Sequence, residues 1–354
     1  MATADELTPR ERRVLEAVIQ TYVQTAEPAG SRVLARRFGL GVSPATIRNT
    51  MSDLEEKGFL THPHTSAGRV PTDKAYRLYV DSLLSAPVSA LVLAERDRLR
   101  DDIARSTSTI ETLLRRAAQS LGVLTQELGV ALGPRLDASV LRRLELLRVG
   151  SERLLLVLTL DGGMVRTVFV EVRGSLADSA VVEVTRVLNE RLAGHSLREL
   201  RASVGERLRD SATNSDAAEL LNVFVQEGEQ LLDAALPVSE ASGSVIVGQA
   251  SVLAAQPEFG AAESMRRLLT LTEEPSRLAD ALRRKHRGDE KPGVSITIGA
   301  EHGDPQLDQF TVVTAEYRSG ALTGVIGVIG PTRMPYDKVI SLVQHTSRLL
   351  SDLL

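Results

Sequence analysis

Small and polar side chains gather on one side of a short predicted helix near the start of this 354-residue chain. The set is Ala45, Thr46, Arg48, Asn49 and Ser52. In the DNA major groove an arginine can donate two hydrogen bonds to guanine, and an asparagine can pair in the same two-point manner with adenine. Small neighbours let the N-terminal part of a helix approach base edges closely. The pattern therefore predicts sequence-specific contact with double-stranded DNA.

The flanking residues predict that this set belongs to one helix with marked ends. Ser43 can cap the N-terminus through its hydroxyl, and Pro44 suits the first helical position because no N–H is needed there. Gly58 suits the position just past the last turn, where φ is usually positive. A buried stripe at helical spacing is predicted for Ile47, Met51 and Leu54. Burial of that stripe would turn the polar set outward.

The neighbouring segments predict the frame of a winged helix-turn-helix. Thr8-Pro9-Arg10-Glu11 is a capping box that starts a first helix, and a second predicted helix, 31–38, is capped by Ser31. Residues 39–42 make a tight glycine turn into the third helix, which is the order of a helix-turn-helix. Residues 59–61 and 69–70 predict two short strands joined by a loop. A hairpin directly after the third helix is a wing.

A second group of side chains is predicted to contact the DNA backbone. Arg69 lies at the base of the predicted wing, and Thr65 and Ser66 lie near its tip, where they can contact phosphate or the minor groove. The other predicted contacts come from cations and from helix starts: Ser31, Arg32, Ser43, Pro44 and Lys74. Phosphate contacts carry affinity but no sequence information. Replacing Lys74 by alanine is therefore expected to weaken binding to all sequences alike.

The charge distribution indicates that only the first part of the chain meets phosphate. The net charge is −4, yet residues 10–80 hold 11 Lys and Arg against 7 Asp and Glu. Residues 81–354 hold 31 basic and 37 acidic side chains. A basic segment on an acidic remainder is typical of a protein that binds nucleic acid through one domain. Aromatic residues make up 3% and tryptophan is absent, which argues against single-strand binding by base stacking.

Other chemistries find little support in the sequence. The chain has no cysteine, which excludes disulfides, thiolate metal ligands and cysteine catalysis. His62 and His64 lack a third ligand nearby, so no metal site is predicted. The glycines of residues 324–330 are spaced G-x-x-G-x-x-G inside an apolar strand, which fails the dinucleotide fingerprint. We predict no cofactor and, because no nucleophile–base pattern stands out, no enzyme activity.

Localisation is predicted from two further features. No secretory signal opens the chain, and its apolar runs are shorter than a bilayer span. The sequence therefore predicts a cytoplasmic protein with no membrane partner.

Beyond residue 84 the pattern predicts an α+β chain with several domains. A boundary falls at Ser85-Ala86-Pro87, and charged helical residues follow to about residue 132. Strands are predicted at 145–149, 154–160 and 165–172, and again at 294–298, 310–317 and 322–329. A mainly helical stretch from 195 to about 290 separates the two groups, with one short strand at 245–247. It is predicted to be an insertion into one domain.

The sequence from Arg10 to Asp81 resembles the start of the HrcA family, the heat-inducible transcription repressors of bacteria. The most specific pieces are Ser43-Pro44-Ala45-Thr46-Ile47-Arg48-Asn49 and Ser66-Ala67-Gly68-Arg69-Val70-Pro71-Thr72, with later similarity at 245–251, 256–259 and 324–334. The resemblance implies a winged helix-turn-helix (1–84), a helical linker (85–105), a GAF-like domain (106–194 and 292–354) and an inserted, mainly helical dimerisation domain (195–291).

The same resemblance implies a function. A homodimer binds an inverted-repeat operator upstream of chaperone operons, represses transcription and is relieved by heat, and a GroEL-type chaperonin promotes the active form. A two-fold operator needs a two-fold protein, which favours dimerisation as the role of the insertion. The alternative is a metabolite-responsive winged-helix regulator whose GAF-like domain senses a small ligand.

Overall fold

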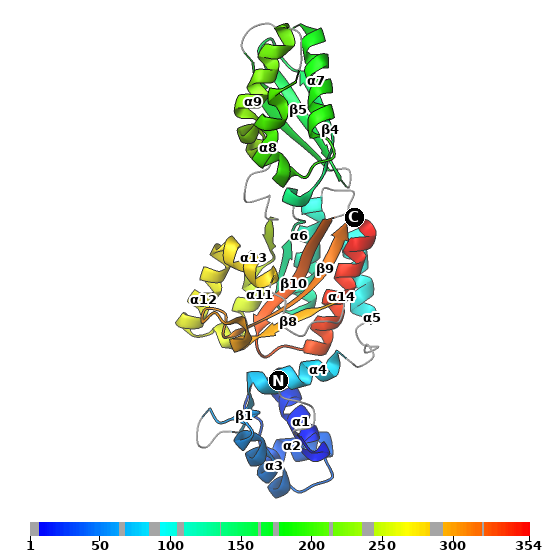
Figure 1. Ribbon diagram of the computed structural model, residues 1–354. Helices are drawn as coiled ribbons and strands as arrows, with labels where there is room; N and C mark the ends of the chain where they lie inside the picture. Colours follow the sequence, from blue (N-terminus) through cyan, green and yellow to red (C-terminus); the bar gives the residue numbers. More distant parts are fainter. Residues whose placement is uncertain are drawn as a thin grey trace. The chain divides into compact units, whose positions relative to one another are not determined.

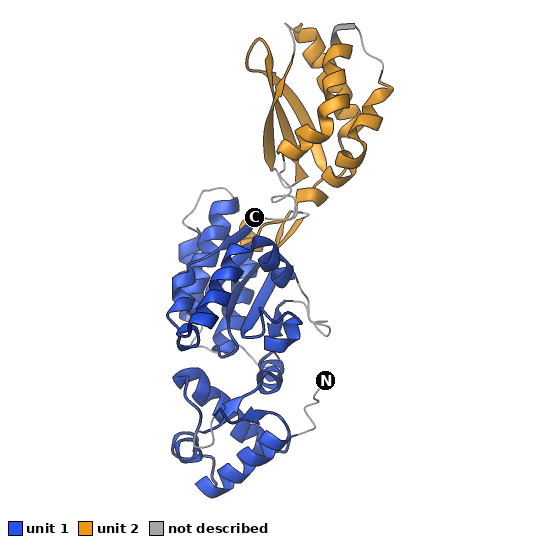
Figure 2. Cartoon of the chain, turned by 90° about the vertical axis from the view of Figure 1, so that its left-hand side faces the viewer, with its two compact units in different colours: residues 1–131, 245–316, 325–349 blue, residues 132–244, 317–324, 350–354 orange. Residues whose placement is uncertain are grey.

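The chain folds as a mixed α+β protein (Figure 1). The computed structural model describes residues 7–63, 68–84, 93–104, 110–134, 136–161, 164–172, 177–211, 215–235, 244–283, 293–320 and 322–354. Within these ranges no helix combines the length and the apolar composition that a membrane span requires. Two compact units can be separated (Figure 2): residues 1–131, 245–316 and 325–349, and residues 132–244, 317–324 and 350–354.

The first unit begins with a group of helices and a small sheet, here called the head (described residues 7–63 and 68–84). Its elements are α1 (Pro9–Thr25), α2 (Ser31–Phe38), α3 (Pro44–Glu56), β1 (Leu60–Thr61), β2 (Val70–Pro71) and α4 (Asp73–Leu83). The predicted capping box is confirmed: the Thr8 hydroxyl accepts from the Glu11 N–H, and the Glu11 carboxylate accepts from the Thr8 N–H. Strands β1 and β2 pair antiparallel, with Leu60 opposite Pro71.

The core of the head forms where α1, α2 and α3 pack together. Several of its side chains have no exposed surface: Val18, Ile19, Leu34, Ile47, Leu54 and Phe59. The strand pair is tied to the loop before α2, because Ala29 and Arg69 exchange two backbone hydrogen bonds of 2.9 and 3.0 Å. A Cβ on Gly68 would lie 2.3 Å from the Ala29 carbonyl oxygen. Only glycine therefore fits at this crossing.

The rest of the first unit, here called the body, is built on a five-stranded sheet. Its order is β7 (Val245–Val247), β3 (Leu128–Leu132), β10 (Leu322–Pro331), β9 (Phe310–Ser319) and β8 (Ser295–Ile298). The helices are α5 (Leu93–Ala104), α6 (Ile110–Thr125), α11 (Ala250–Ala254), α12 (Ala262–Glu273), α13 (Pro275–Arg283) and α14 (Tyr336–Leu353), with 3-10 turns η5 (Pro257–Phe259) and η6 (Gly299–His302). The body is therefore discontinuous in sequence.

The second unit contains a separate antiparallel sheet with order β4-β5-β6. Its elements are η3 (Leu136–Ala138), β4 (Leu141–Arg148), β5 (Arg153–Leu160), β6 (Val165–Glu171), α7 (Asp178–Leu192), α8 (Leu197–Arg209) and α9 (Ser215–Ala235). Leu146 lies opposite Leu156, and Leu156 opposite Val168, and all three are buried. Helices α7 and α9 contact this sheet, and α8 packs on α7 and α9. The alternating apolar pattern of the strands thus gives a sheet with one covered face.

The domain boundaries predicted from sequence differ from this division. The predicted insertion, 195–291, leaves the three strands in the GAF-like segment 106–194, whereas the structure groups β4, β5 and β6 with α7, α8 and α9. Residues 245–283, predicted within the insertion, belong to the body. The reason is that an alternating strand pattern shows that one face is buried without showing what covers it. Buried side chains of the helices, including Leu200, Leu208 and Phe224, cover this sheet.

The predicted linker, 85–105, also differs in its role. Its described part, α5, is helical as predicted but packs along α6. Leu99 and Ile103 have no exposed surface, and Arg96 Nη2 donates to Ser341 Oγ of α14 at 2.8 Å. Because its apolar residues are buried, α5 is a packed element of the body.

One carboxyl group is buried in the body, just before β3. Glu127 has 2% of its surface exposed, and Gln256 Nε2 donates to its Oε2 at 3.1 Å. A Cβ on Gly330 would lie 2.1 Å from that oxygen, so glycine leaves the space that the carboxyl group occupies. Burial raises the pKa of Glu127 well above its ordinary value of 4.5, since desolvation disfavours the charged form.

We predict that Glu127→Gln stabilises the folded chain at neutral pH by about 1–3 kcal/mol. Because the folded-state pKa lies above that of the unfolded chain, stability is lost as the pH rises from 4.5 towards the raised value. Glutamine avoids this loss and keeps an acceptor for Gln256. Urea denaturation at about pH 4 and about pH 7.5 measures the difference. A gain of the same size at both pH values would contradict the prediction.

Candidate nucleic-acid interface

Helix α3 has the two unlike faces that its sequence predicts. The Ser43 hydroxyl accepts the Thr46 N–H at 3.2 Å and so caps the helix, with Pro44 as its first residue. Past its C-terminus, Gly58 takes a φ of +77°. The stripe of Ile47, Met51 and Leu54 is at most 4% exposed and packs into the core of the head. The predicted cap, the first residue and the buried stripe are confirmed.

The opposite face of α3 carries the side chains predicted to contact bases. Ala45, Arg48 and Asn49 are exposed, and Thr46 and Ser52 are half-buried. Neither the Arg48 nor the Asn49 side chain has a hydrogen-bond partner among the described residues, so both are available to a ligand. The Ser52 hydroxyl donates to the carbonyl of Arg48 at 3.3 Å. Ser52 therefore bonds back to its own helix.

Glu55, near the end of α3, holds the base of the strand pair. Its Oε2 lies 2.8 Å from Arg69 Nη2, and its Oε1 lies 2.6 Å from His62 Nδ1. The side chain of Arg69 is 14% exposed. Arg69 is thus paired and largely covered, and its contact with DNA stays a prediction. Its charge serves to fix the strand pair on α3.

Lys74 lies against the end of α3, where it has partners within the head. Its Nζ donates to the carbonyl of Lys57, at the C-terminal cap of α3, at 3.1 Å and lies 4.2 Å from the ring centre of Phe59. A cation at a helix C-terminus satisfies an orphan carbonyl and the helix dipole. Lys57 in turn lies 2.7 Å from Glu11 of α1. This hydrogen bond lowers the pKa of Glu11, because it favours the charged carboxylate.

The remaining residues that are predicted to contact phosphate differ in their exposure. Arg32 is exposed on α2. Ser31 is 9% exposed and is the first residue of α2. The N-cap position is occupied by Gly30, which makes no side-chain hydrogen bond, so the prediction that Ser31 caps the helix is wrong. Ser43 and Pro44 are exposed at the start of α3. Thr65 and Ser66, like His64, lie outside the described residues.

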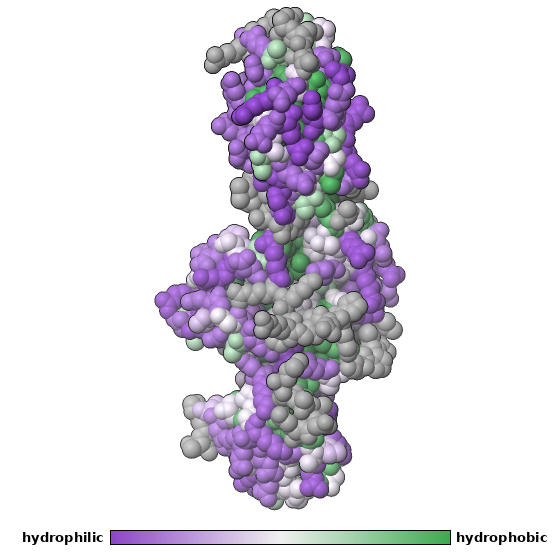
Figure 3. Space-filling model, in the orientation of Figure 1, coloured by the Kyte–Doolittle hydropathy of each residue, from purple (hydrophilic) through white to green (hydrophobic). Residues whose placement is uncertain are grey.

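Three further arginines of the head were missed by the sequence analysis. Arg10, Arg13 and Arg36 are exposed and make no ion pair with any described residue. Arg10 and Arg13 line a pocket of about 180 Å³ together with Leu40 and Val42, residues of the turn that leads into α3. Hydrophilic residues cover most of the head surface visible in Figure 3. The missed signal was the Thr8-Pro9 start of α1, which places two arginines on its first turns.

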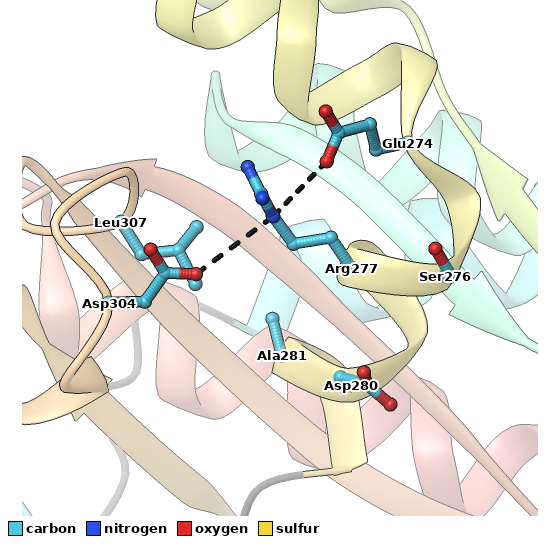
Figure 4. A pocket seen from close by; sticks show the side chains of 7 residues that line it. All are labelled: Glu274, Ser276, Arg277, Asp280, Ala281, Asp304 and Leu307. Atoms are coloured by element: carbon cyan, nitrogen blue, oxygen red, sulfur yellow. Dashed lines mark ion pairs between the residues drawn. The ribbon is translucent and has the colours of Figure 1, made fainter.

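The body also has a polar pocket, which bears on the small-ligand alternative. It measures about 250 Å³ and is lined by Glu274 just before α13, by residues of α13 that include Arg277, and by Asp304 in the segment before β9 (Figure 4). Arg277 Nε lies 3.1 Å from Glu274 Oε2 and 3.9 Å from Asp304 Oδ2. The guanidinium charge is already matched by these carboxylates, so the pocket offers an anionic ligand no unpaired cation.

Metal ligation has no cluster to use in the part of the chain that the structure describes. No group of three or more His, Cys, Asp or Glu side chains is placed to hold an ion there. The one His62 contact with a carboxylate, that with Glu55, is a pair rather than a ligand set.

The outward face of α3 is a candidate DNA-binding surface. A capped helix whose outward face carries an arginine and an asparagine with no partner in the described part of the chain, beside exposed arginines and a strand pair, is an arrangement that duplex DNA can accept. The family model described as the HrcA protein C-terminal domain matches residues 111–340, well over half of the chain. The chain belongs to the HrcA family.

Full-length relatives agree with this assignment. The heat-inducible transcription repressor HrcA of Chlorobium chlorochromatii (strain CaD3) is 38% identical over 352 residues, covering 99% of this chain and 98% of the relative. The protein of the same name from Geobacter sulfurreducens is 39% identical over 350 residues, with the same coverage. A crystal structure described as a hypothetical protein superposes with a TM-score of 0.63 at 23% identity and covers 98% of both chains. That likeness shows the fold.

We predict that Lys74→Ala lowers the stability of the head by about 1 kcal/mol, because a helix-end hydrogen bond and a cation–π contact are lost. The salt dependence of DNA binding by the folded protein should stay as in the wild type. Thermal melting and a salt titration measure the two quantities. Arg36→Ala, which removes an exposed cation that has no ion-pair partner among the described residues, should leave the melting temperature unchanged. A smaller salt slope with unchanged melting for Lys74→Ala would contradict this prediction and favour a phosphate contact by Lys74.

Proposed function

We propose that the chain is a heat-inducible transcription repressor that binds an inverted-repeat operator in double-stranded DNA as a homodimer. The observation that carries this proposal is that Arg48 and Asn49, on the face of α3 opposite its buried stripe, have no side-chain partner among the residues that the structure describes. The names of the full-length relatives supply the heat-inducible repressor role.

In this proposal the head is a winged helix-turn-helix. Helix α3 enters the major groove with its N-terminal half, where Arg48 and Asn49 meet base edges and Ala45 and Thr46 permit close approach. Phosphate is met by the helix start at Ser43 and Pro44 and by the exposed arginines of α1 and α2: Arg10, Arg13, Arg32 and Arg36. The segment between β1 and β2, with Thr65 and Ser66, forms the wing.

The second unit offers a surface for the second copy of the chain. Leu147, Leu155 and Phe169 lie opposite one another across β4, β5 and β6, on the sheet face away from the helices. Leu147 is 49% and Phe169 56% exposed. Charges of both signs flank this row, in the pairs Arg143–Glu145 and Arg153–Glu171. A face that presents both signs can pair with its own copy about a two-fold axis, which an inverted repeat requires.

The remaining parts of the proposal depend on the family. The body is the GAF-like domain, the protein is cytoplasmic, and a GroEL-type chaperonin promotes its active form. Loss of the marginally stable dimer on warming then relieves repression. The metabolite-responsive alternative would need a ligand site in the body, and the pocket beside Arg277 is the candidate to test by calorimetry.

We predict that Arg48→Ala costs about 1–3 kcal/mol of operator affinity and relaxes the choice of base at one position in each half-site. Arg36→Ala is the matched control, because it removes an exposed arginine of the head that is not on the outward face of α3. It should weaken all sequences alike and reduce the salt slope by about 1. Selection from randomised operators measures base preference. An unchanged preference in Arg48→Ala would show that α3 does not contact bases in this way.

We predict that Phe169→Asp turns the dimer into a monomer, because a charge would be buried at the centre of the sheet face. Val182→Asp is the control: Val182 is 70% exposed on α7, away from this face, and should leave the dimer intact. Sedimentation equilibrium of both variants gives the oligomeric state. A monomer produced by Val182→Asp and not by Phe169→Asp would place the interface on the helices instead.

A further inference from the structure

Helix α4 connects the head to the body through charged contacts at its first two turns. Arg77 makes a two-point pair with Glu301, with Nε 2.7 Å from Oε1, and its Nη2 donates to the carbonyl of Ile296 at 2.7 Å. Asp73 Oδ2 accepts the N–H of Ala300 at 3.0 Å. Gly299 has a φ of +49°, and a Cβ there would lie 2.2 Å from Asp73 Oδ2. The backbone of η6 is thus shaped to receive α4.

A second charged contact holds the end of α1. Arg333, which follows β10, places Nη1 2.8 Å from the carbonyl oxygen of Val23, in the last turn of that helix. The same guanidinium makes a two-point pair with Glu258 of η5, with Nη2 3.0 Å from Oε2. The side chains of Arg333 and Glu258 are 14% and 25% exposed. Arg333 therefore caps a helix of the head while it is anchored in the body.

An apolar contact lies within the same junction. The rings of Tyr76 in α4 and Tyr336 in α14 are 5.7 Å apart, and each residue is 1% exposed. Two-point arginine–carboxylate pairs are geometrically specific as well as strong. One of these pairs ties α4 to the body and the other, through Arg333, ties α1 to it. Several separate contacts therefore hold the head in one orientation on the body, whereas a single contact would act as a hinge.

The junction is connected to α3 through the packed core of the head. Helix α3 packs against α1, and Lys57 at the C-cap of α3 pairs with Glu11 of α1 at 2.7 Å. Because α1 is held by Arg333 at its other end, the direction of α3 is fixed with respect to the body. In a dimer on DNA, the separation of the two recognition helices determines which half-site spacing can be bound.

Building on the proposed function, we propose that Arg77 and Arg333 are positioning residues that set the half-site spacing accepted by the dimer. They contact no DNA in this proposal. They hold each head at one place on its body, and so they remove one source of variation in the separation of the two α3 helices. Segments 256–259 and 324–334, similar to the family yet remote from α3, contribute the Glu258 and Arg333 of this junction.

The first test measures binding to a series of inverted repeats whose central spacer is shortened or lengthened by one to five base pairs, together with a duplex that holds a single half-site. The wild type should prefer one spacer. In the Arg77→Ala/Arg333→Ala double variant the ratio between the best and the worst spacer should fall roughly fivefold or more. Affinity for the single half-site should stay unchanged, because α3 itself is intact.

Matched variants separate this effect from a loss of charge or of folding. Arg266→Ala removes an arginine that pairs with Glu263 on the exposed surface of α12, and it should keep the wild-type spacer preference. Glu301→Gln keeps the size of the side chain and one acceptor, and it should weaken the preference even if the double variant does not fold. A spacer preference equal to that of the wild type in both junction variants would overturn the proposal.

The second test measures the head directly and needs no DNA. Because the chain has no cysteine, Glu56→Cys on α3 and Ala262→Cys on α12 give one labelled pair. Spin labels on a labelled protomer diluted with unlabelled chain report the intrachain distance distribution. It should be narrow in the otherwise unaltered protein and broad in the junction variants. Equal widths would overturn the proposal, whereas a narrow distribution with no affinity for any inverted repeat would refute the proposed function alone.

Discussion

The burial of one face of α3 is the constraint on which the rest of the head depends. Ile47 and Leu54 have no exposed surface, so the helix cannot turn about its own axis without opening the core. That fixes the outward direction of Arg48 and Asn49. The Ser43 cap completes the first turn and leaves the helix start exposed. A surface suited to base edges thus follows from the packing of the opposite side.

The charges of the head are divided between two tasks. The carboxylates of Glu11 and Glu55 are paired with Lys57 and Arg69, and these pairs hold α1 and the strand pair against α3. The exposed Arg10, Arg13, Arg32 and Arg36 of α1 and α2 make no ion pair with any described residue. Two other arginines, Arg77 and Arg333, join the head to the body. Some arginines therefore stabilise the folded protein through ion pairs, and other arginines are exposed and can attract a ligand.

Local signals made the ends and faces of α3 predictable, because a cap, a first-turn proline and an apolar stripe all act within one helix. The contact partners of the charged side chains could not be predicted. Lys74 bonds to a carbonyl 17 residues away and Arg69 to a carboxylate on another element, and no spacing rule encodes such contacts. The strands of the second unit were found from their alternation, yet their assignment to a separate sheet required knowing which helices cover them. A sequence pattern thus predicts that a side chain is buried more readily than it predicts which residue that side chain contacts.

Comparing operator with scrambled duplex tests most directly whether α3 gives this protein sequence-specific binding. The full chain is titrated, at one ionic strength near 150 mM, against an inverted-repeat fragment of a chaperone promoter and against the same bases in random order. We expect the inverted repeat to bind at least about a thousandfold more tightly. Equal affinity for the two fragments, from a folded dimer, would contradict the assignment of α3 as the helix that recognises DNA sequence.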